Sequence, residues 1–453
     1  MGPTKQLAAY VSQLKYSDIP APVVEKVKEC LLDYAGCTLF AAQTDMGKYI
    51  TAYGTADNSG VSSILPEGKA KYNSTMAALI NGTLCHGFEL DDTMAVAIGH
   101  PGATVIPPAV SLGEELGSSG EDLITAIVAG YEVFARIAAT MAGPSIAKGF
   151  HPTGTLGVMG ATISASKMLG LDAKTIESAL GLAGSMASGL TQFSLNGSMV
   201  KRIHAGKSAM QGVMCAKLAK LGFTGPEDII EGQKGFSKVF SQEPYDQIPW
   251  DRLTEGLGDG NYKIMDISFK PSPACGMLHS ILDNLDVIRK DPRYSLDKVK
   301  EIIVKGNENQ VNEHNIYEPK SILSAQYSLP FTVGLHLTGN VKDASQYLSE
   351  DILKNEAAIA VGKKVRTQLD EEVQSYYPKF LGSRVEVVLE DGTRLESYLK
   401  SPKGSGVNPF TWEELYEKYD ALCANVVTPQ VSRAIADQIR KADQIGVREL
   451  FQR

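Results

Sequence analysis

The hydrophobic pattern of the chain changes near residue 262, and this change limits the possible folds more than any other feature. Up to about residue 230 apolar side chains recur at helical spacing, as in Val23, Val27 and Leu31. Ser119 and Asp172 stand at helix starts, where short polar side chains cap free amide groups. Further helices are predicted over 123–141, 158–169 and 205–221. The first part of the chain therefore predicts an all-helical domain.

Strands are predicted only after the change. One covers 298–305, and two more, 384–389 and 393–399, flank Asp391-Gly392, which is the strongest short signal for a β-hairpin. Helices are expected at 280–289 and 351–361 and again, after the turn-rich segment 401–409, at 412–423 and 431–445. The pattern predicts a mainly α fold. Residues 1–265 and 401–453 would form a large helical domain, with a smaller α+β domain inserted at 266–400.

The 43 glycines are concentrated in or beside the predicted helices. In a helix interior a glycine costs about 0.5–1 kcal/mol relative to alanine, so its presence needs a reason. We expect helices that pack closely, or backbone that approaches a ligand.

The charge and cysteine content narrow the class of protein. A net charge of −8 gives no basic surface for nucleic acid, so no nucleic-acid partner is expected. No uncharged apolar stretch reaches the roughly 18 residues that a membrane span needs, and no signal peptide is recognised at the N-terminus. The six cysteines are scattered, which favours a reducing compartment. We expect a cytoplasmic protein with no membrane partner.

Five of the seven histidines have glycine or proline neighbours, which favours helix ends or turns that face a cleft. These five are His86, His100, His151, His204 and His279. Histidine titrates near neutral pH and therefore suits proton transfer. The alternative, a hydrogen-bonded structural histidine, stays open for each one, and we adopt it for His314 and His336.

The sequence lacks the spacings that mark metal and nucleotide sites. Neither H-E-x-x-H nor a cysteine pair is present, and there is no phosphate-binding G-x-x-x-x-G-K-[ST] loop. We therefore expect no metal and no cofactor.

Basic side chains gather around His204. Lys201, Arg202 and Lys207 open a predicted helix, whose free amide groups also favour an anion, and Lys270 lies near the predicted domain junction. A solvated basic surface would explain the first three equally well. Together with the histidines, they indicate a site for a small anionic substrate.

At these residues the chain resembles the MmgE/PrpD family, which includes 2-methylcitrate dehydratase, cis-aconitate decarboxylase and iminodisuccinate epimerase. The similar segments are 86–93 (HGFELDDT) with His100-Pro101-Gly102, 150–157 (FHPTGTLG), 197–206 (GSMVKRIHAG) and 269–279 (FKPSPACGMLH). The resemblance implies a helical domain with an α+β lid in a homodimer. It also implies a site lined by Glu89, Asp92, Thr93, His100, His151, Lys201, His204, Lys270, Cys275 and His279.

Two positions depart from the family pattern. Cys275 stands where animal cis-aconitate decarboxylases carry histidine, and Met94 follows Thr93 where many bacterial relatives carry another residue, often histidine. The first segment also lacks the Asp-Phe-Asn-Asp-Thr motif of the methylcitrate dehydratases. Its Asp91-Asp92, together with Gly99-His100-Pro101, is similar to the epimerase as well.

The resemblance implies a reaction with proton transfer at a carbon beside a carboxylate. We interpret His151 and His100 as the base and the acid, with the order of the two roles left open, and Lys201, helped by Lys270, as the partner of the substrate carboxylates. We expect a lyase that acts on a small di- or tricarboxylic acid. Dehydration of the 2-methylcitrate type, decarboxylation of the cis-aconitate type, epimerisation and a silent carboxylate-binding protein remain as alternatives.

Overall fold

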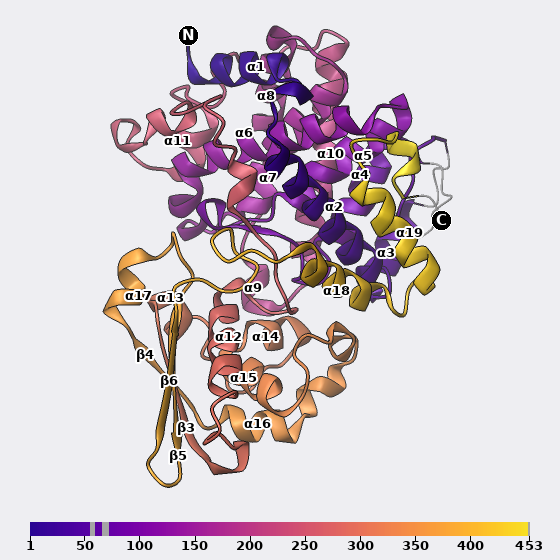
Figure 1. The fold of residues 1–453 in the computed structure, drawn as a ribbon. Helices are drawn as coiled ribbons and strands as arrows, with labels where there is room; N and C mark the ends of the chain where they lie inside the picture. Colours follow the sequence, from indigo (N-terminus) through magenta and orange to yellow (C-terminus); the bar gives the residue numbers. More distant parts are fainter. Residues whose placement is uncertain (55–58, 66–71, 452–453) are drawn as a thin grey trace. The chain divides into compact units, whose positions relative to one another are not determined.

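The computed structural model describes residues 1–54, 59–65 and 72–451 (Figure 1). The described chain forms two compact units. The helical unit contains residues 1–267 and 411–453, and the α+β unit contains residues 268–410. The chain thus leaves the helical unit once and returns to it.

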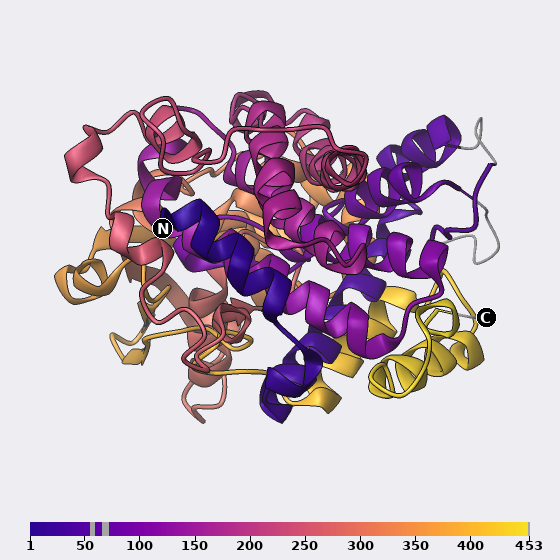
Figure 2. The same ribbon diagram turned by 90° about the horizontal axis from the view of Figure 1, so that it is seen from above.

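The helical unit consists almost entirely of α-helices. These are α1 (Pro3–Gln13), α2 (Ala21–Ala41), α3 (Asp45–Gly54), α4 (Ser74–Cys85), α5 (Gly102–Leu116), α6 (Gly120–Ala147), α7 (Pro152–Met168), α8 (Ala173–Met186), α9 (Phe193–Asn196), α10 (Val200–Lys220), α11 (Phe236–Ser241), α18 (Trp412–Cys423) and α19 (Pro429–Arg440). The two-residue strands are β1 (Thr93–Met94) and β2 (Ile267–Ser268), the latter at the passage to the next unit. The C-terminal helices, in yellow, lie beside the N-terminal ones, in indigo (Figures 1 and 2), and α18 packs on α2.

Helix α6 is the most apolar long helix of the described chain. By length and composition it could cross a membrane, but 94% of its most apolar window is buried inside the protein. It also carries a buried ion pair, in which Arg136 Nε donates to Glu132 Oε1 over 2.7 Å. The helix starts at the predicted cap, because the Ser119 side chain accepts from the amide of Asp122. Helix α6 is therefore a core helix of the helical unit.

Two glycines allow α10 to lie close to its neighbours. A Cβ on Gly206 would come within 2.2 Å of Leu79 O on α4, and one on Gly212 within 2.5 Å of the Ala161 Cβ on α7. Because any larger residue would separate the helices, the predicted reason for these glycines, close helix packing, is confirmed. This packing brings the first turn of α10 to the ends of α4 and α7.

The α+β unit is built around a four-stranded sheet in the order β4-β3-β5-β6. Its strands are β3 (Val299–Gly306), β4 (Val365–Leu369), β5 (Ser383–Leu389) and β6 (Arg394–Leu399). Strand β3 pairs antiparallel with β5 and parallel with β4. The predicted hairpin is confirmed, since β5 and β6 pair from Ser383↔Leu399 to Val388↔Arg394.

Helices complete the α+β unit. They are α12 (His279–Ile288), α13 (Glu308–Asn312), α14 (Ile322–Tyr327), α15 (Leu329–Thr338), α16 (Glu356–Gly362) and α17 (Glu371–Tyr376). Ile281 and Leu285 of α12 share one buried core with Val385 and Val387 of β5.

Several elements differ from the sequence-based expectation: α6, α7 and α10 begin three to six residues earlier than expected, and three further differences have a local cause. The helix expected at 351–361 is interrupted at Asn355, whose side chain caps α16 by accepting from the amide of Ala358. The last predicted helix ends at Arg440 and does not reach residue 445. Strand β4 was not predicted, because this edge strand buries Val365 while its other residues are exposed or half-buried.

Candidate active site

The loop of residues 86–92 between α4 and β1 carries the first group of site residues. His86 ends α4 as its C-cap, and Glu89 adopts a left-handed backbone with φ of 57°. Such a conformation is unusual for a residue with a Cβ and persists where the surroundings fix it. The loop must therefore be held by specific contacts.

Two of these contacts come from distant helices. Lys418 of α18 donates to Leu90 O over 2.8 Å and also pairs with Asp33 of α2. The Asp92 carboxylate accepts from the Tyr131 hydroxyl of α6 over 2.6 Å and from the amide of Gly102, at the start of α5, over 2.9 Å. Burial raises the pKa of Asp92 to about 7 despite these two donors. The structure thus gives the Asp92 side chain a role in fixing the loop.

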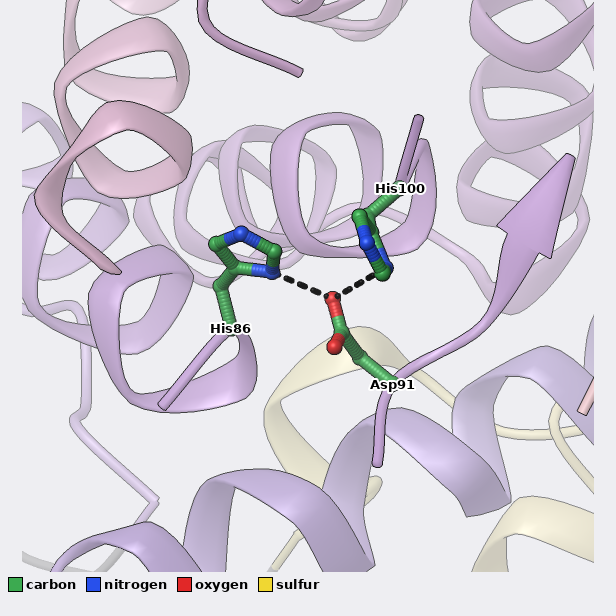
Figure 3. Close-up of side chains that lie close together, drawn as sticks. All are labelled: His86, Asp91 and His100. Atoms are coloured by element: carbon green, nitrogen blue, oxygen red, sulfur yellow. Dashed lines mark hydrogen bonds and ion pairs between the residues drawn. The ribbon is translucent and has the colours of Figure 1, made fainter. Parts of the chain in front are cut away.

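Asp91 joins two histidines (Figure 3). Its Oδ2 lies 2.8 Å from Nδ1 of His86 and 3.3 Å from Nδ1 of His100, and all three side chains are buried. Burial would raise the pKa of Asp91, but the two ring N–H groups hold it well below its usual value. Burial lowers the pKa of His86 to about 3. Asp91 is therefore an ionised carboxylate between two rings, and the His86 ring is neutral.

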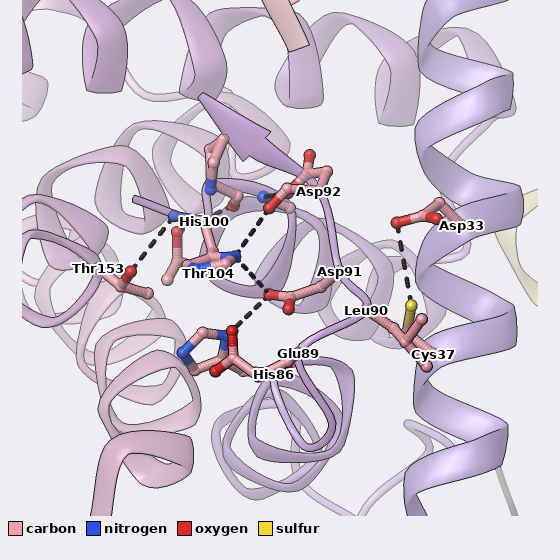
Figure 4. A network of polar contacts seen from close by, with 12 residues as sticks. Asp33, Cys37, His86, Glu89, Leu90, Asp91, Asp92, His100, Thr104 and Thr153 are labelled. Atoms are coloured by element: carbon pink, nitrogen blue, oxygen red, sulfur yellow. Dashed lines mark hydrogen bonds and ion pairs between the residues drawn. The ribbon is translucent and has the colours of Figure 1, made fainter. Parts of the chain in front are cut away.

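His100 is fixed by its backbone and by one ring nitrogen (Figure 4). The Nδ1 atom also lies 2.9 Å from Asp92 O, and the amide donates to Thr153 Oγ1 over 3.2 Å. Because Nδ1 is engaged with two oxygens, Nε2 is the nitrogen that remains for a substrate. Thr93, which follows Asp92, is half-buried in β1.

A second pair of histidines meets nitrogen to nitrogen. Nδ1 of His151, the N-cap of α7, lies 2.9 Å from Nδ1 of His204 on α10. Only one of these atoms can carry the shared proton, because two N–H groups would repel each other. Burial lowers the pKa of His151 well below its usual value, and burial and Lys207 lower that of His204 to about 4, with Lys201 contributing to both shifts. The pair is neutral at pH 7.

The two groups of histidines belong to one cluster. The His86 ring centroid lies 4.6 Å from that of His100 and 6.0 Å from that of His151, and the His151 and His204 centroids are 5.1 Å apart. Phe193 packs edge-on against His151 at 5.0 Å. The four rings form a continuous row.

Two cations and one carboxylate lie beside this row. Lys201 and Arg202 both donate to Glu89 Oε1, the latter over 2.5 Å, and Arg202 also donates to His86 O over 3.4 Å. All three side chains are buried. The group carries one net positive charge, which suits a substrate carboxylate.

Lys207 adds a further cation to the same helix. Its Nζ donates to the carbonyl and hydroxyl oxygens of Ser188, each over 2.7 Å. Burial lowers its pKa to about 8. Ser188 precedes Gly189, whose carbonyl accepts from the amide of His151, so Lys207 supports the backbone that places His151.

Among the described residues, one group of three could hold a metal ion, namely His86, Asp91 and His100. Two imidazoles and a carboxylate are suitable ligands. Here the Asp91 Oδ2 atom accepts from both rings, so an ion would have to replace the two hydrogen bonds that orient them. The expectation of a metal-free site stays a prediction.

Three expected site residues belong to the α+β unit. Lys270 and His279 are buried, with His279 Nε2 3.3 Å from Ser272 O, and Cys275 is half-buried. The other seven lie in the helical unit: Glu89, Asp92, Thr93, His100, His151, Lys201 and His204.

Three residues of the cluster, Asp91, His86 and Arg202, were not among the site residues that the family resemblance implied. His86 and Arg202 had been named as candidates on their residue type and neighbours, and Asp91 had not. The signal was present, because His86 and Asp91 stand in the same segment, HGFELDD, and Arg202 follows Lys201. The sequence could not indicate that the carboxylate of Asp91, and not that of Asp92, contacts the histidine rings, since the turn at Glu89 decides where each carboxylate points.

Comparison with known proteins covers almost the whole chain. Residues 5–248 match the MmgE/PrpD N-terminal domain, and residues 272–444 match the MmgE/PrpD C-terminal domain. The cis-aconitate decarboxylase of Aspergillus terreus is 25% identical over 98% of this chain and 94% of its own length. The cis-aconitate decarboxylases of Mus musculus and Homo sapiens are 25% and 26% identical, over 98% and 94% of this chain and 91% and 88% of their own lengths.

Proposed function

The chain belongs to the MmgE/PrpD family, and from this premise we propose that it is a lyase that transfers a proton beside a carboxylate of a small di- or tricarboxylic acid. Decarboxylation of the cis-aconitate type is the first reaction to test, because the relatives with near-complete coverage carry that name. The observation that carries the proposal is the row of four histidine rings next to Lys201 and Arg202.

The cations would bind the substrate before any proton moves. Glu89 neutralises only one of the two charges on Lys201 and Arg202, so a substrate carboxylate can share these donors with it. Charge-assisted hydrogen bonds of this kind fix orientation as well as affinity. The substrate would then be held by its carboxylate, with the reacting carbon directed to the rings.

We assign His100 as the proton donor. Its Nδ1 is held by Asp91 Oδ2 and Asp92 O, so the Asp91 carboxylate stabilises positive charge on the ring. In a decarboxylation, one carbon–carbon bond breaks, carbon dioxide leaves, and the electron pair stays on the substrate. The carbon then takes the proton from His100 Nε2.

We assign His151 as the base that a dehydration would also need. The proton shared with His204 decides whether Nε2 of His151 presents a lone pair or an N–H group. With the shared proton on His151 Nδ1, its Nε2 can remove a proton from carbon, and His204 Nδ1 accepts the hydrogen bond. His100 would then protonate the leaving hydroxyl group, so that one water is lost.

Proton NMR in heavy water tests the proposal directly. We would incubate the protein with cis-aconitate and with a panel of hydroxy-tricarboxylic and amino-dicarboxylic acids. Decarboxylation would give an unsaturated dicarboxylate with one deuterium, and dehydration would give an alkene from a hydroxy acid. Hydrogen exchange with inversion and no loss of carbon or water would identify an epimerase instead. Absence of both turnover and exchange for every acid would overturn the proposal.

A further inference from the structure

A cysteine and a histidine face each other inside the α+β unit. The Cys275 Sγ lies 3.7 Å from Nε2 of His314, within the range of a sulfur hydrogen bond. The Nδ1 of the same ring lies 2.9 Å from Tyr327 O. The sequence alone had favoured a structural role for His314.

The carbonyl of Tyr327 fixes the tautomer of His314. A carbonyl oxygen only accepts hydrogen bonds, so Nδ1 must carry the proton that it donates. In the neutral ring Nε2 then has the lone pair, and this lone pair points to the Cys275 thiol. A nucleophile, a base and a group that orients the base thus stand in order.

Neighbouring charges favour the ionised thiol. Burial would raise the pKa of Cys275, but the charge of His314, its hydrogen bond, the amide of Met277 and the charge of Lys270 together lower it. Burial would lower the pKa of His314, but the negative sulfur raises it, with a smaller contribution from Glu313. Tyr377 also feels the Cys275 charge, and its own pKa is raised mainly by burial.

Cys275 also differs from the other cysteines in exposure. Its side chain is half-buried, whereas the other five, Cys30, Cys37, Cys85, Cys215 and Cys423, are buried. Burial raises the pKa of four of these thiols, Cys30, Cys37, Cys85 and Cys215. An electrophile that reaches the folded protein would therefore meet one cysteine suited to react.

We propose that Cys275 and His314 form a nucleophilic thiolate–imidazolium pair, a site of covalent modification for small α,β-unsaturated carbonyl compounds. The sulfur adds to the β-carbon of the acceptor, and a carbon–sulfur bond forms as the π bond breaks. The electron pair moves to the α-carbon, which takes the proton from His314 Nε2. The net step adds the thiol across the double bond and needs no oxidant or reductant.

The test is the pH dependence of alkylation of the full chain by N-ethylmaleimide. Rates are measured from pH 5.5 to 9 by intact mass, and the adduct is located by peptide mapping. An unassisted thiol with pKa near 8.5 would react about 50-fold faster or more at pH 9 than at pH 6.5. For Cys275 we expect one adduct and a rate that changes less than about fivefold over this interval.

Two variants separate the pair from a merely exposed thiol. Cys275→Ser should abolish the single adduct. His314→Asn keeps a donor for Tyr327 O but removes the base, so alkylation at pH 6.5 should slow about 10-fold or more and recover at pH 9. A wild-type rate that rises steeply through pH 8.5, or an adduct on another cysteine of the folded protein, would overturn the inference. The pH profile of the wild-type alkylation rate tests the inference even if a variant does not fold. Neither the profile nor the variant rates depend on the reaction proposed for the active site.

Discussion

Two pairs of histidines in the helical unit are held together in different ways. His86 and His100 meet through the Asp91 carboxylate, whereas His151 and His204 meet nitrogen to nitrogen. A carboxylate between rings stabilises a ring that becomes positive, but two nitrogens in direct contact can hold only one proton. We therefore assign proton donation to His100 of the first pair and proton acceptance to His151 of the second.

The largest loss of kcat is expected from a substitution in the His151–His204 pair, which has no carboxylate between its rings. His151→Ala should lower kcat by roughly 10²–10⁴-fold, the usual loss when a general acid or base is removed. Affinity for a competitive polycarboxylate inhibitor should stay near normal, because the cations that bind carboxylates remain. The measurement is steady-state kinetics with inhibitor titration. His336→Ala, a buried histidine of the α+β unit, is the matched control and should keep kcat. Full turnover of His151→Ala would refute its role, provided that melting curves show a folded protein.

Removing the charge of the Asp91 carboxylate should leave both histidine pairs without a negative charge between the rings. Asp91→Asn keeps the size of the side chain but removes the charge that supports His100. A hydrogen bond to a charged group contributes about 1.5–3 kcal/mol, so kcat should fall about 10- to 100-fold. Steady-state kinetics and inhibitor affinity check this result. An unchanged kcat would show that the difference between the pairs has no catalytic consequence.

The neutral state of the His151–His204 pair should make the stability of the folded protein depend on pH in the acid range. The pKa of His204 is about 4 in the folded protein and about 6.5 in an unfolded chain, so the unfolded state binds more protons between these values. The contribution of His204 is complete above pH 6.5 and is lost as pH falls toward 4. Asp92, with its pKa raised to about 7, acts in the opposite direction over this interval. The test is therefore a difference: Tm of His204→Asn should fall less steeply from pH 6.5 to 4.5 than Tm of the wild type. Parallel curves would contradict the assignment.

The smallest effect is expected from metal removal. If the Asp91 oxygen binds two ring N–H groups and no ion, prolonged treatment with a chelator should leave kcat unchanged. Activity assays before and after dialysis check this. Loss of activity that zinc, iron or magnesium restores would mean that the first pair is a metal centre.

The sequence was sufficient for the local features that depend on neighbouring residues. The caps at Ser119 and Asp172 and the hairpin at Asp391-Gly392 were predicted and are observed, and the close helix packing expected of helical glycines in general is observed at Gly206. Each follows from the chemistry of a few adjacent positions, whether a free amide, a tight turn or an absent Cβ.

Contacts between residues of distant segments could not be predicted from the sequence. Nothing in the sequence separates Asp91 from Asp92, because the left-handed turn at Glu89 directs one to the histidines and the other to Tyr131. His314 stands 39 positions from Cys275, and no periodicity connects them. The contact between His151 and His204 likewise depends on how α7 and α10 pack.

The bond from Lys418 to Leu90 O has a consequence for synthesis of the protein. The loop that carries Glu89 and Asp91 is translated early, yet one of its anchors is translated after the entire α+β unit. While the chain is still on the ribosome, the loop lacks this contact, and Asp33 lacks its partner Lys418. The contact between this loop and Lys418 can therefore form only after helix α18 has left the exit tunnel, later than the contacts that the helices before residue 267 supply.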